Sequence, residues 1–297
     1  MRILVSGSRG LIGSSLTAFL TAEGHQVIRL VREKSSKQEN AVYWNPQIGE
    51  ANKEDFEGFD AMVHLAGENI FRFRWSKKKK ETLFQSRCRD TWLLSQILTR
   101  LNLPPKIVIS ASAIGIYGDR GKETLTESSP PGRGFLADLC TKWEEATASI
   151  EARGSRVVHT RFGMVLSPEG GALKKMLGLF RWGLGGRIGS GDQFVSWIAI
   201  DDAIGAIYHC LISHELEGPV NVVAPHPVTN AQFTHTLAKL LHRPACFHIP
   251  RWVLRLILGE IADEVILPSA QVVPQKLIET GYQFKFSELE PCLRSFL

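Results

Sequence analysis

Three glycines near the start of the chain, Gly7, Gly10 and Gly13, restrict the possible folds more than any other feature. They follow an apolar run that begins at Ile3 and precede an amphipathic stretch, which is the pattern of a strand, a tight turn and a helix. Such glycines permit a sharp bend, a close approach of the backbone to a pyrophosphate at the helix N-terminus, and tight packing of helix on strand. We therefore expect a dinucleotide-binding turn made of Gly7, Ser8, Arg9, Gly10, Leu11, Ile12 and Gly13.

A glycine loop without a ligand is the alternative, and the next residues favour the nucleotide. Gly24 stands where the helix should end, and the apolar residues 26–31 predict a second strand. Folds that prefer NAD place Asp or Glu after this strand, to accept hydrogen bonds from the ribose 2′-hydroxyl. This chain has Arg32 directly after Val31, with Arg9 and Arg29 nearby.

These arginines predict NADP(H), because a guanidinium binds the additional phosphate of NADP through bidentate, charge-assisted hydrogen bonds. Val31 and Arg32 are therefore candidate cofactor residues. The alternative is that the arginines are ordinary solvated charges at a strand end, and it weighs more for Arg29 than for Arg32.

Strand and helix patterns continue to alternate, which predicts an α/β fold with a doubly wound parallel Rossmann sheet. The end of the third strand borders the adenine in this architecture, so Trp44 or Asn45 could contact the base; a packing aromatic and a turn residue are the alternative. Helices are expected from the basic run at 72–80 to about Leu101 and over 135–152.

We expect residues 1–164 to form the NADP-binding domain, with its sheet completed by about 193–225. Residues 165–192 and 226–297 are expected to form a smaller, mainly helical lobe that closes over the crevice. Asp201 is predicted to cap a helix that reaches His214, and Ser287 with Glu290 has the pattern of a capping box before the last helix.

Composition excludes several classes of function. No apolar run approaches the roughly 20 residues that cross a bilayer, and the nine histidines and five scattered cysteines lack the spacing of a metal site. The cysteine pattern, and a first strand that begins at Arg2, predict an intracellular and most simply cytoplasmic protein, with an organelle left open. We expect a small-molecule substrate, no metal and no membrane partner; the net charge of +5 does not by itself imply nucleic acid, and a homo-oligomer is left open.

Residues 72–80 contain six basic side chains at the expected start of a helix, where cations oppose the helix dipole. We expect a solvated charged face. A clamp for a cofactor or substrate phosphate is the alternative, and a nucleic-acid patch is the least favoured interpretation.

Several motifs together resemble the extended and atypical short-chain dehydrogenase/reductases, the group of the nucleotide-sugar epimerases. The resemblance spans essentially the whole chain and is carried by the glycine turn, residues 64–67, residues 109–112 with Tyr117 and Gly118, and residues 161–163. Residues 135–144, 193–198, 274–277 and 281–284 are similar to one epimerase-family branch. The resemblance implies that the cofactor also contacts Leu65, Ala66, Gly67, Glu68, Ser110, Arg161 and Phe162.

The family's catalytic pair is missing. Working members place Tyr-x-x-x-Lys on the helix after the fifth strand, where the lysine lowers the tyrosine pKa and the phenol moves a proton during hydride transfer. The helix expected over 135–152 contains no tyrosine. Two alignments of the pair are open. In one, Lys142 takes the lysine position and Asp138 the tyrosine position; in the other, Leu136 and Cys140 take the tyrosine and lysine positions.

Ser112 matches the family's catalytic serine or threonine, so we expect it to orient a carbonyl, with Tyr117 or Asp119 as proton donor. A strand-end serine bonded to the backbone is the alternative for Ser112. The sequence thus favours an NADP(H)-dependent oxidoreductase or epimerase-like enzyme acting on a small molecule. The missing pair favours a second reading, a non-catalytic NADP(H)-binding sensor or interaction protein.

Overall fold

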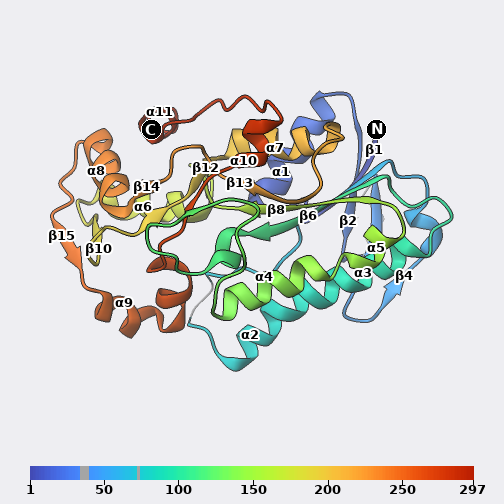
Figure 1. Cartoon of the computed structure of the whole chain (residues 1–297), viewed down its shortest axis with the longest axis horizontal. Coiled ribbons are helices and arrows are strands. Elements are labelled where there is room, and N and C mark those ends of the chain that lie inside the picture. Colours follow the sequence, from blue (N-terminus) through green and yellow to red (C-terminus); the bar gives the residue numbers. More distant parts are fainter. Residues whose placement is uncertain (34–39, 72–73) are drawn as a thin grey trace.

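The structure, a computed structural model, describes residues 1–33, 40–71 and 74–297. An eight-stranded sheet lies at its centre (Figure 1), in the order β13-β8-β6-β5-β1-β2-β3-β4. All neighbours in this sheet are parallel except β3 and β4. Its strands are β1 (Arg2–Ser6), β2 (Gln26–Val31), β3 (Ala41–Asn45), β4 (Glu50–Ala51), β5 (Ala61–His64), β6 (Ile107–Ala113), β8 (Arg156–Phe162) and β13 (Gly218–Val222).

The chain winds outward from β1 in one direction and from β5 in the other, so the doubly wound parallel sheet is confirmed. Ile3 and Val5 pack on one face of β1, against α1 (Leu11–Ala22) and α7 (Ile200–Ile212). Leu4 points to the other face and packs near α3 (Asp90–Thr99) and α5 (Ala148–Ala152). Helices thus cover both faces, which is why the central strands are almost wholly apolar.

Both long helices of the first part differ from the prediction. The first begins at Lys77 and consists of α2 (Lys77–Phe84), a π-helical segment η2 (Gln85–Arg89) and α3. The second is divided into α4 (Phe135–Glu145) and α5. The helix breaks here because the Thr147 hydroxyl donates to the Glu144 carbonyl, at 2.9 Å, and contacts His159 at 2.8 Å.

The smaller lobe lies at one end of the sheet (Figure 1) and has its own apolar core around Trp197 and Phe233. Of the segment predicted to complete the main sheet, only β13 joins it, since β11 and β12 pair elsewhere. The lobe and its connections include α6 (Gly171–Arg181), β10 (Gly186–Ile188), β11 (Phe194–Val195), β12 (Trp197–Ala199), β14 (Val228–Thr229), α8 (Asn230–Leu241), β15 (Phe247–Ile249), α9 (Arg251–Leu258), η4 (Ala262–Ile266) and α11 (Leu289–Arg294). The remaining short elements are η1 (Lys53–Phe56), η3 (Ile114–Tyr117), β7 (Thr124–Leu125), β9 (Met164–Leu166), β16 (Gln271–Val272) and α10 (Gln275–Glu279).

Two predicted helix caps are wrong. The N-cap of α7 is Ala199, without a side-chain cap. Next to Asp201, the carboxylate of Asp202 instead accepts hydrogen bonds from the Lys285 and Phe286 backbone, at 2.7 and 2.9 Å, and so fastens the C-terminal segment. The N-cap residue of α11 is Glu288, whose side chain makes no cap, whereas the sequence pattern at 229–232 forms a capping box on α8 that the prediction missed.

One carboxylate of the smaller lobe, Glu264 in η4, caps α4. Its two oxygens accept the backbone N–H groups of Phe135 and Leu136, at 3.1 and 2.9 Å. The N-cap residue Gly134 has φ +115°, and a Cβ there would lie 2.9 Å from a Glu264 oxygen. A second link joins α2 to the residues just before η4, where Lys80 forms an ion pair with Glu260. The smaller lobe is therefore fastened to the helix that borders the crevice.

We expect Glu264→Ala to lower the free energy of unfolding by about 1–2 kcal/mol, because two N–H groups of α4 lose a charged acceptor. Asp263→Ala is the matched control: it removes only an exposed ion pair with Arg255, worth less than about 0.5 kcal/mol. Urea unfolding of both variants measures the difference. Equal losses in the two would contradict the capping role of Glu264.

Candidate cofactor site and active site

The three glycines have different structural roles in the turn. A Cβ on Gly7, which has φ +67°, would lie 2.7 Å from the Leu65 backbone, and one on Gly13 would lie 2.2 Å from the Gly7 carbonyl oxygen. These two positions therefore allow β5 and α1 to pack against the turn. Gly10 is the N-cap of α1, with no side-chain cap and no acidic residue in the first turn. The first N–H groups of α1 are left for an anion, so the turn fits a pyrophosphate.

The residues after β2 place positive charge beside this turn. Arg32 is 52% exposed, and its Nη2 lies 3.5 Å from a carboxylate oxygen of Asp90, at the start of α3. Burial raises the Asp90 pKa, while the charges of Arg32 and Arg89 act in the opposite direction. Asp90 thus contacts one side of the Arg32 guanidinium, and the other side is exposed to solvent, which fits a phosphate ligand.

The other predicted residues near the adenosine half are spread more widely. Arg9 is exposed, whereas Arg29 is a partly buried residue inside β2, in register with Val5. Trp44 is 4% exposed and packs in the core, as its alternative reading had it. Asn45 is partly exposed and accepts the Gln47 N–H at 3.0 Å, so it keeps the turn geometry of its alternative reading while its adenine contact stays a prediction.

Ser6 joins the ends of β1 and β5. Its hydroxyl accepts the N–H groups of Leu65 and Ala66, at 3.2 and 3.3 Å, and therefore donates its proton to His64 Nδ1 at 2.6 Å. His64 Nε2 then donates to Thr91 Oγ1 at 3.0 Å. Burial, aided by the positive charge of Arg32, lowers the His64 pKa to about 4. This histidine is consequently neutral at physiological pH.

A buried polar row continues from Ser6 across the sheet. His64, Ser110 and His159 are direct neighbours in register on β5, β6 and β8. Ser110 is 1% exposed, and its hydroxyl has no hydrogen-bond partner among the residues that the structure describes. The structure thus places the Ser110 side chain inside this row, under the strand ends, and its predicted cofactor contact stays a prediction.

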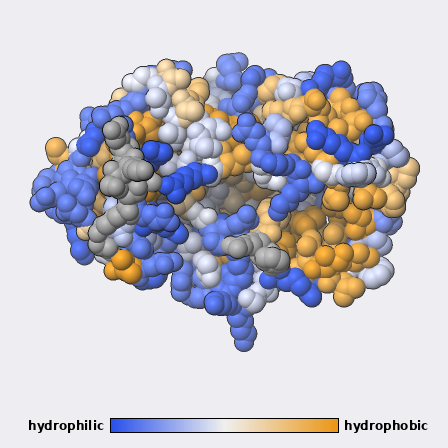
Figure 2. Space-filling model, turned by 180° about the vertical axis from the view of Figure 1, so that it is seen from behind, coloured by the Kyte–Doolittle hydropathy of each residue, from blue (hydrophilic) through white to orange (hydrophobic). Residues whose placement is uncertain are grey.

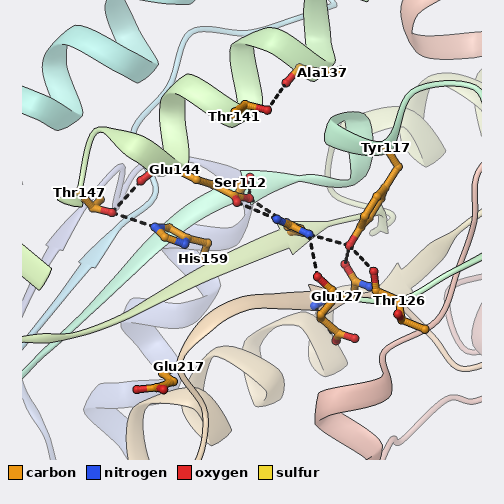
Figure 3. A network of polar contacts seen from close by, with 12 residues as sticks. Ser112, Tyr117, Thr126, Glu127, Ala137, Thr141, Glu144, Thr147, His159 and Glu217 are labelled. Carbon is orange, nitrogen blue, oxygen red and sulfur yellow. Dashed lines mark hydrogen bonds and ion pairs between the residues drawn. The ribbon is translucent and has the colours of Figure 1, made fainter. Parts of the chain in front are cut away.

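Ser112 lies two residues further along β6 and belongs to a second network, shown in Figure 3. Its hydroxyl donates to Glu144 Oε1 at 2.7 Å. Arg161 binds the same carboxylate with two nitrogens, each at 2.8 Å, and its third nitrogen donates to the Tyr117 hydroxyl, also at 2.8 Å. All three nitrogens of Arg161 are therefore engaged within the protein. The sequence missed Glu144 as the partner of Arg161, whose predicted cofactor contact stays a prediction.

Tyr117 is completely enclosed at the other end of this network. Its hydroxyl also contacts Asn221 Oδ1 at 2.7 Å and the Thr126 carbonyl at 3.0 Å. Burial raises the Tyr117 pKa, and the nearby Arg161 only partly offsets this. The hydroxyl thus holds several chain segments together. Its predicted part in proton donation stays a prediction, as does that of Asp119, whose carboxylate accepts the N–H groups of Gly121 and Ser269.

In one of the two alignments, the family's catalytic pair falls on two α4 positions that are apolar in character. Leu136 and Cys140 are both buried and face Gly115 in the loop after β6. Burial raises the Cys140 pKa to about 12, so its thiol stays protonated and carries no charge at neutral pH. Cys140 therefore does not replace the lysine.

The face that carries the crevice is hollowed near its centre, between the sheet domain and the smaller lobe, and apolar residues gather on the lobe (Figure 2). Predicted residues on this side include Leu65, Ala66 and Phe162, all partly buried, and Gly67, which is exposed. Glu68 binds Lys79 at 2.6 Å, which accounts for one lysine of the basic run. The first two residues of that run, 72 and 73, lie outside the described residues. A separate surface cavity of about 690 Å³ lies between α8 and residues 242–248, away from the strand ends.

Within residues 1–33, 40–71 and 74–297, no three His, Cys, Asp or Glu side chains gather as metal ligands would. No helix in the same ranges has the length and the apolar character to cross a membrane.

Three features define the chain as a dinucleotide-binding protein of the doubly wound class. They are the glycine turn, the N-terminus of α1 without a side-chain cap, and the arginine that follows β2. Comparison with known proteins identifies the family within this class. The family model "NAD dependent epimerase/dehydratase family" matches residues 3–223, and a domain of unknown function, DUF1731, matches residues 249–296. The chain belongs to the NAD dependent epimerase/dehydratase family.

Relatives match over nearly the whole length. The human epimerase family protein SDR39U1 is 37% identical over 300 residues, which is all of both chains. The epimerase family protein Mb2239 of Mycobacterium bovis is 40% identical over 98% of this chain and 96% of its own. The crystal structure of human SDR39U1 with NADPH superposes with a TM-score of 0.91 at 35% identity, over 100% of this chain and 99% of that one. The resemblance inferred from the motifs is thereby confirmed.

The buried histidine gives a prediction for stability against pH. Because the pKa of His64 is lower in the folded chain than the ordinary value of about 6.5, the unfolded chain binds more protons between about pH 4 and 6.5. The free energy of unfolding should therefore fall as the pH drops through this window, by up to about 1.4 kcal/mol per pH unit for this group.

Urea unfolding of the wild type and of His64→Gln over this range isolates the contribution of His64. The variant should show the shallower dependence, while His159, whose pKa burial also lowers, keeps part of the slope in both proteins. Parallel curves for the two proteins would show that His64 is not neutral in the folded state.

Proposed function

We propose that this protein binds NADP(H) at the carboxyl ends of β1, β2 and β5 and acts as an oxidoreductase or epimerase-like enzyme on a small molecule. The observation that carries the proposal is the uncapped N-terminus of α1 beside the half-exposed Arg32. The NADPH found in the crystal structure of human SDR39U1 supports the same choice of cofactor.

In this proposal the glycine turn and the first N–H groups of α1 hold the pyrophosphate, and Arg32 binds the 2′-phosphate. Asp90 sets the position of the Arg32 guanidinium. Asn45 borders the adenine, and the backbone of Leu65, Ala66 and Gly67 supports the half of the cofactor that carries the nicotinamide. Bound NADP(H) supplies or accepts a hydride; the chain itself supplies orientation and polarity.

Ser112 is the residue we propose to contact the reacting oxygen of the substrate. A hydroxyl has one proton, and that of Ser112 is directed to the Glu144 carboxylate. Its free lone pairs therefore suit an alcohol, whose O–H donates to Ser112, better than a carbonyl, which needs a donor. The bidentate pair of Glu144 with Arg161 holds this polarity in place.

A non-catalytic NADP(H)-binding protein is the second candidate function. It is favoured by the apolar positions of Leu136 and Cys140, and by large apolar side chains that the smaller lobe leaves in solvent. Trp182 is 85% exposed and Trp252 is 66% exposed. Such a patch is typical of a surface that meets a partner.

Titration of the purified protein with NADPH and NADH, followed by tryptophan fluorescence, tests the cofactor. Arg32→Gln should weaken NADPH by about 10- to 100-fold, because a charged group loses its hydrogen bonds to a phosphate, and should leave NADH within about twofold. Arg100→Gln is the control, since it removes the same charge from an exposed site at the far end of α3. Equal binding of both nucleotides by wild type and variant would contradict the assignment to NADP(H).

The role of Ser112 is tested once an alcohol substrate has been found by screening the NADP⁺ complex. Ser112→Ala should lower kcat/KM by about 10- to 100-fold and leave NADPH affinity unchanged, because only the contact with the reacting oxygen is lost. Ser155→Ala is the control, because it removes a buried hydroxyl that donates to the Pro105 carbonyl, just before β8 and at the opposite end of the sheet from Ser112. If no alcohol labelled with deuterium on its carbinol carbon transfers that deuterium to NADP⁺ although the nucleotide binds, the sensor interpretation takes precedence.

A further inference from the structure

A nearly enclosed guanidinium lies beside the loop that follows β5. It belongs to Arg87, in the π-helical segment η2 between α2 and α3. A π-helical turn adds a residue to the regular spacing and changes the direction of nearby side chains, and such turns are frequent at functional sites. Ser86 and Arg87 both turn toward the loop: Ser86 Oγ accepts the Glu68 N–H at 3.2 Å, and Arg87 Nη2 donates to the Glu68 carbonyl at 3.0 Å.

Arg87 has few partners for a group so enclosed. Its guanidinium packs over the Trp143 ring, 5.1 Å from the centroid, and Nη1 contacts Ser86 Oγ at 3.5 Å. Burial lowers the pKa of Arg87, and the charge of Glu68 acts in the opposite direction. Among the residues that the structure describes, no carboxylate forms an ion pair with it. By contrast, the other enclosed arginine, Arg161, holds a bidentate carboxylate.

The position of Arg87 indicates what its remaining donors face. A Cβ on Gly67 would lie 3.5 Å from the Arg87 guanidinium carbon, so the group borders the exposed backbone of that glycine. The same loop begins at Leu65, which packs on Gly7 of the glycine turn. His64, the last residue of β5, is in register with Ser110, two residues before Ser112 on β6. Arg87 therefore borders the loop that joins the phosphate turn to the end of β5, next to the strand that carries Ser112.

We propose that Arg87 binds oxygen atoms on the nicotinamide side of the dinucleotide, so that η2 supplies a cation close to the apolar pair Leu136 and Cys140 of α4. The proposal rests on the proposed NADP(H) function. Arg87 acts as a positioning residue: its planar fork holds the nicotinamide half against the loop at 65–68.

The test compares two ligands that share the adenosine and its 2′-phosphate. NADPH contains the nicotinamide half, and adenosine 2′,5′-bisphosphate lacks it. Arg87→Gln and Arg87→Met should each weaken NADPH by about 10- to 100-fold and leave the bisphosphate within about twofold. The glutamine variant keeps a donor for the Glu68 carbonyl and so guards against misfolding. Arg32→Gln should weaken both ligands.

Arg89→Met is the matched control, because Arg89 lies in the same π-helical segment and is exposed. It should change neither affinity. Unchanged NADPH binding in both Arg87 variants, or an equal loss of both ligands, would overturn the proposal for Arg87 while leaving the cofactor assignment intact. If the wild type binds neither ligand, the proposed function itself fails.

Discussion

The packing of α1 and β5 around the first turn depends on two positions that have no side chain. A Cβ at residue 13 would lie 2.2 Å from the Gly7 carbonyl oxygen, and one at residue 7 would meet the Leu65 backbone at 2.7 Å. Neither contact could be relieved by moving a flexible side chain, because both partners are backbone. The same two contacts bring the N-terminus of α1 and the loop after β5 to one edge of the sheet. The candidate cofactor site therefore follows directly from packing.

Much of the fold could be predicted because the signals are local. The glycine spacing, the continuous apolar strands and the alternation of periods gave the doubly wound sheet and its crevice. The helix interruption and the long-range caps could not be predicted from local signals. The interruption at Thr147 depends on a hydrogen bond to His159, a residue of another strand, and the caps at 202 and 264 join segments far apart in the sequence. A capping box is local, yet the pattern at 287–290 was preferred to the real one at 229–232.

The candidate site shows the same division. Residue types at the glycine turn and at position 32 could be assigned from sequence, since their spacing carries the chemistry. Arg161 was assigned to the cofactor because its position matched a motif, but the motif cannot show that Glu144 and Tyr117 occupy all three nitrogens. Arg87 carried no sequence signal, because its direction is set by a π-helical turn within a run that reads as a regular helix.

The buried pair of Glu144 and Arg161 is better understood as a means of orientation than as a source of stability. Removing two charges from water costs several kcal/mol per ion, and their attraction roughly repays this only when the geometry is good. What the pair adds is direction: the carboxylate takes the Ser112 proton, and the guanidinium holds the Tyr117 hydroxyl. A strand end with a fixed hydrogen-bond polarity is thus kept without the tyrosine and lysine of the wider family. Chemistry at this edge, in our proposal, depends on a fixed acceptor at Ser112 and a separate cation at Arg87.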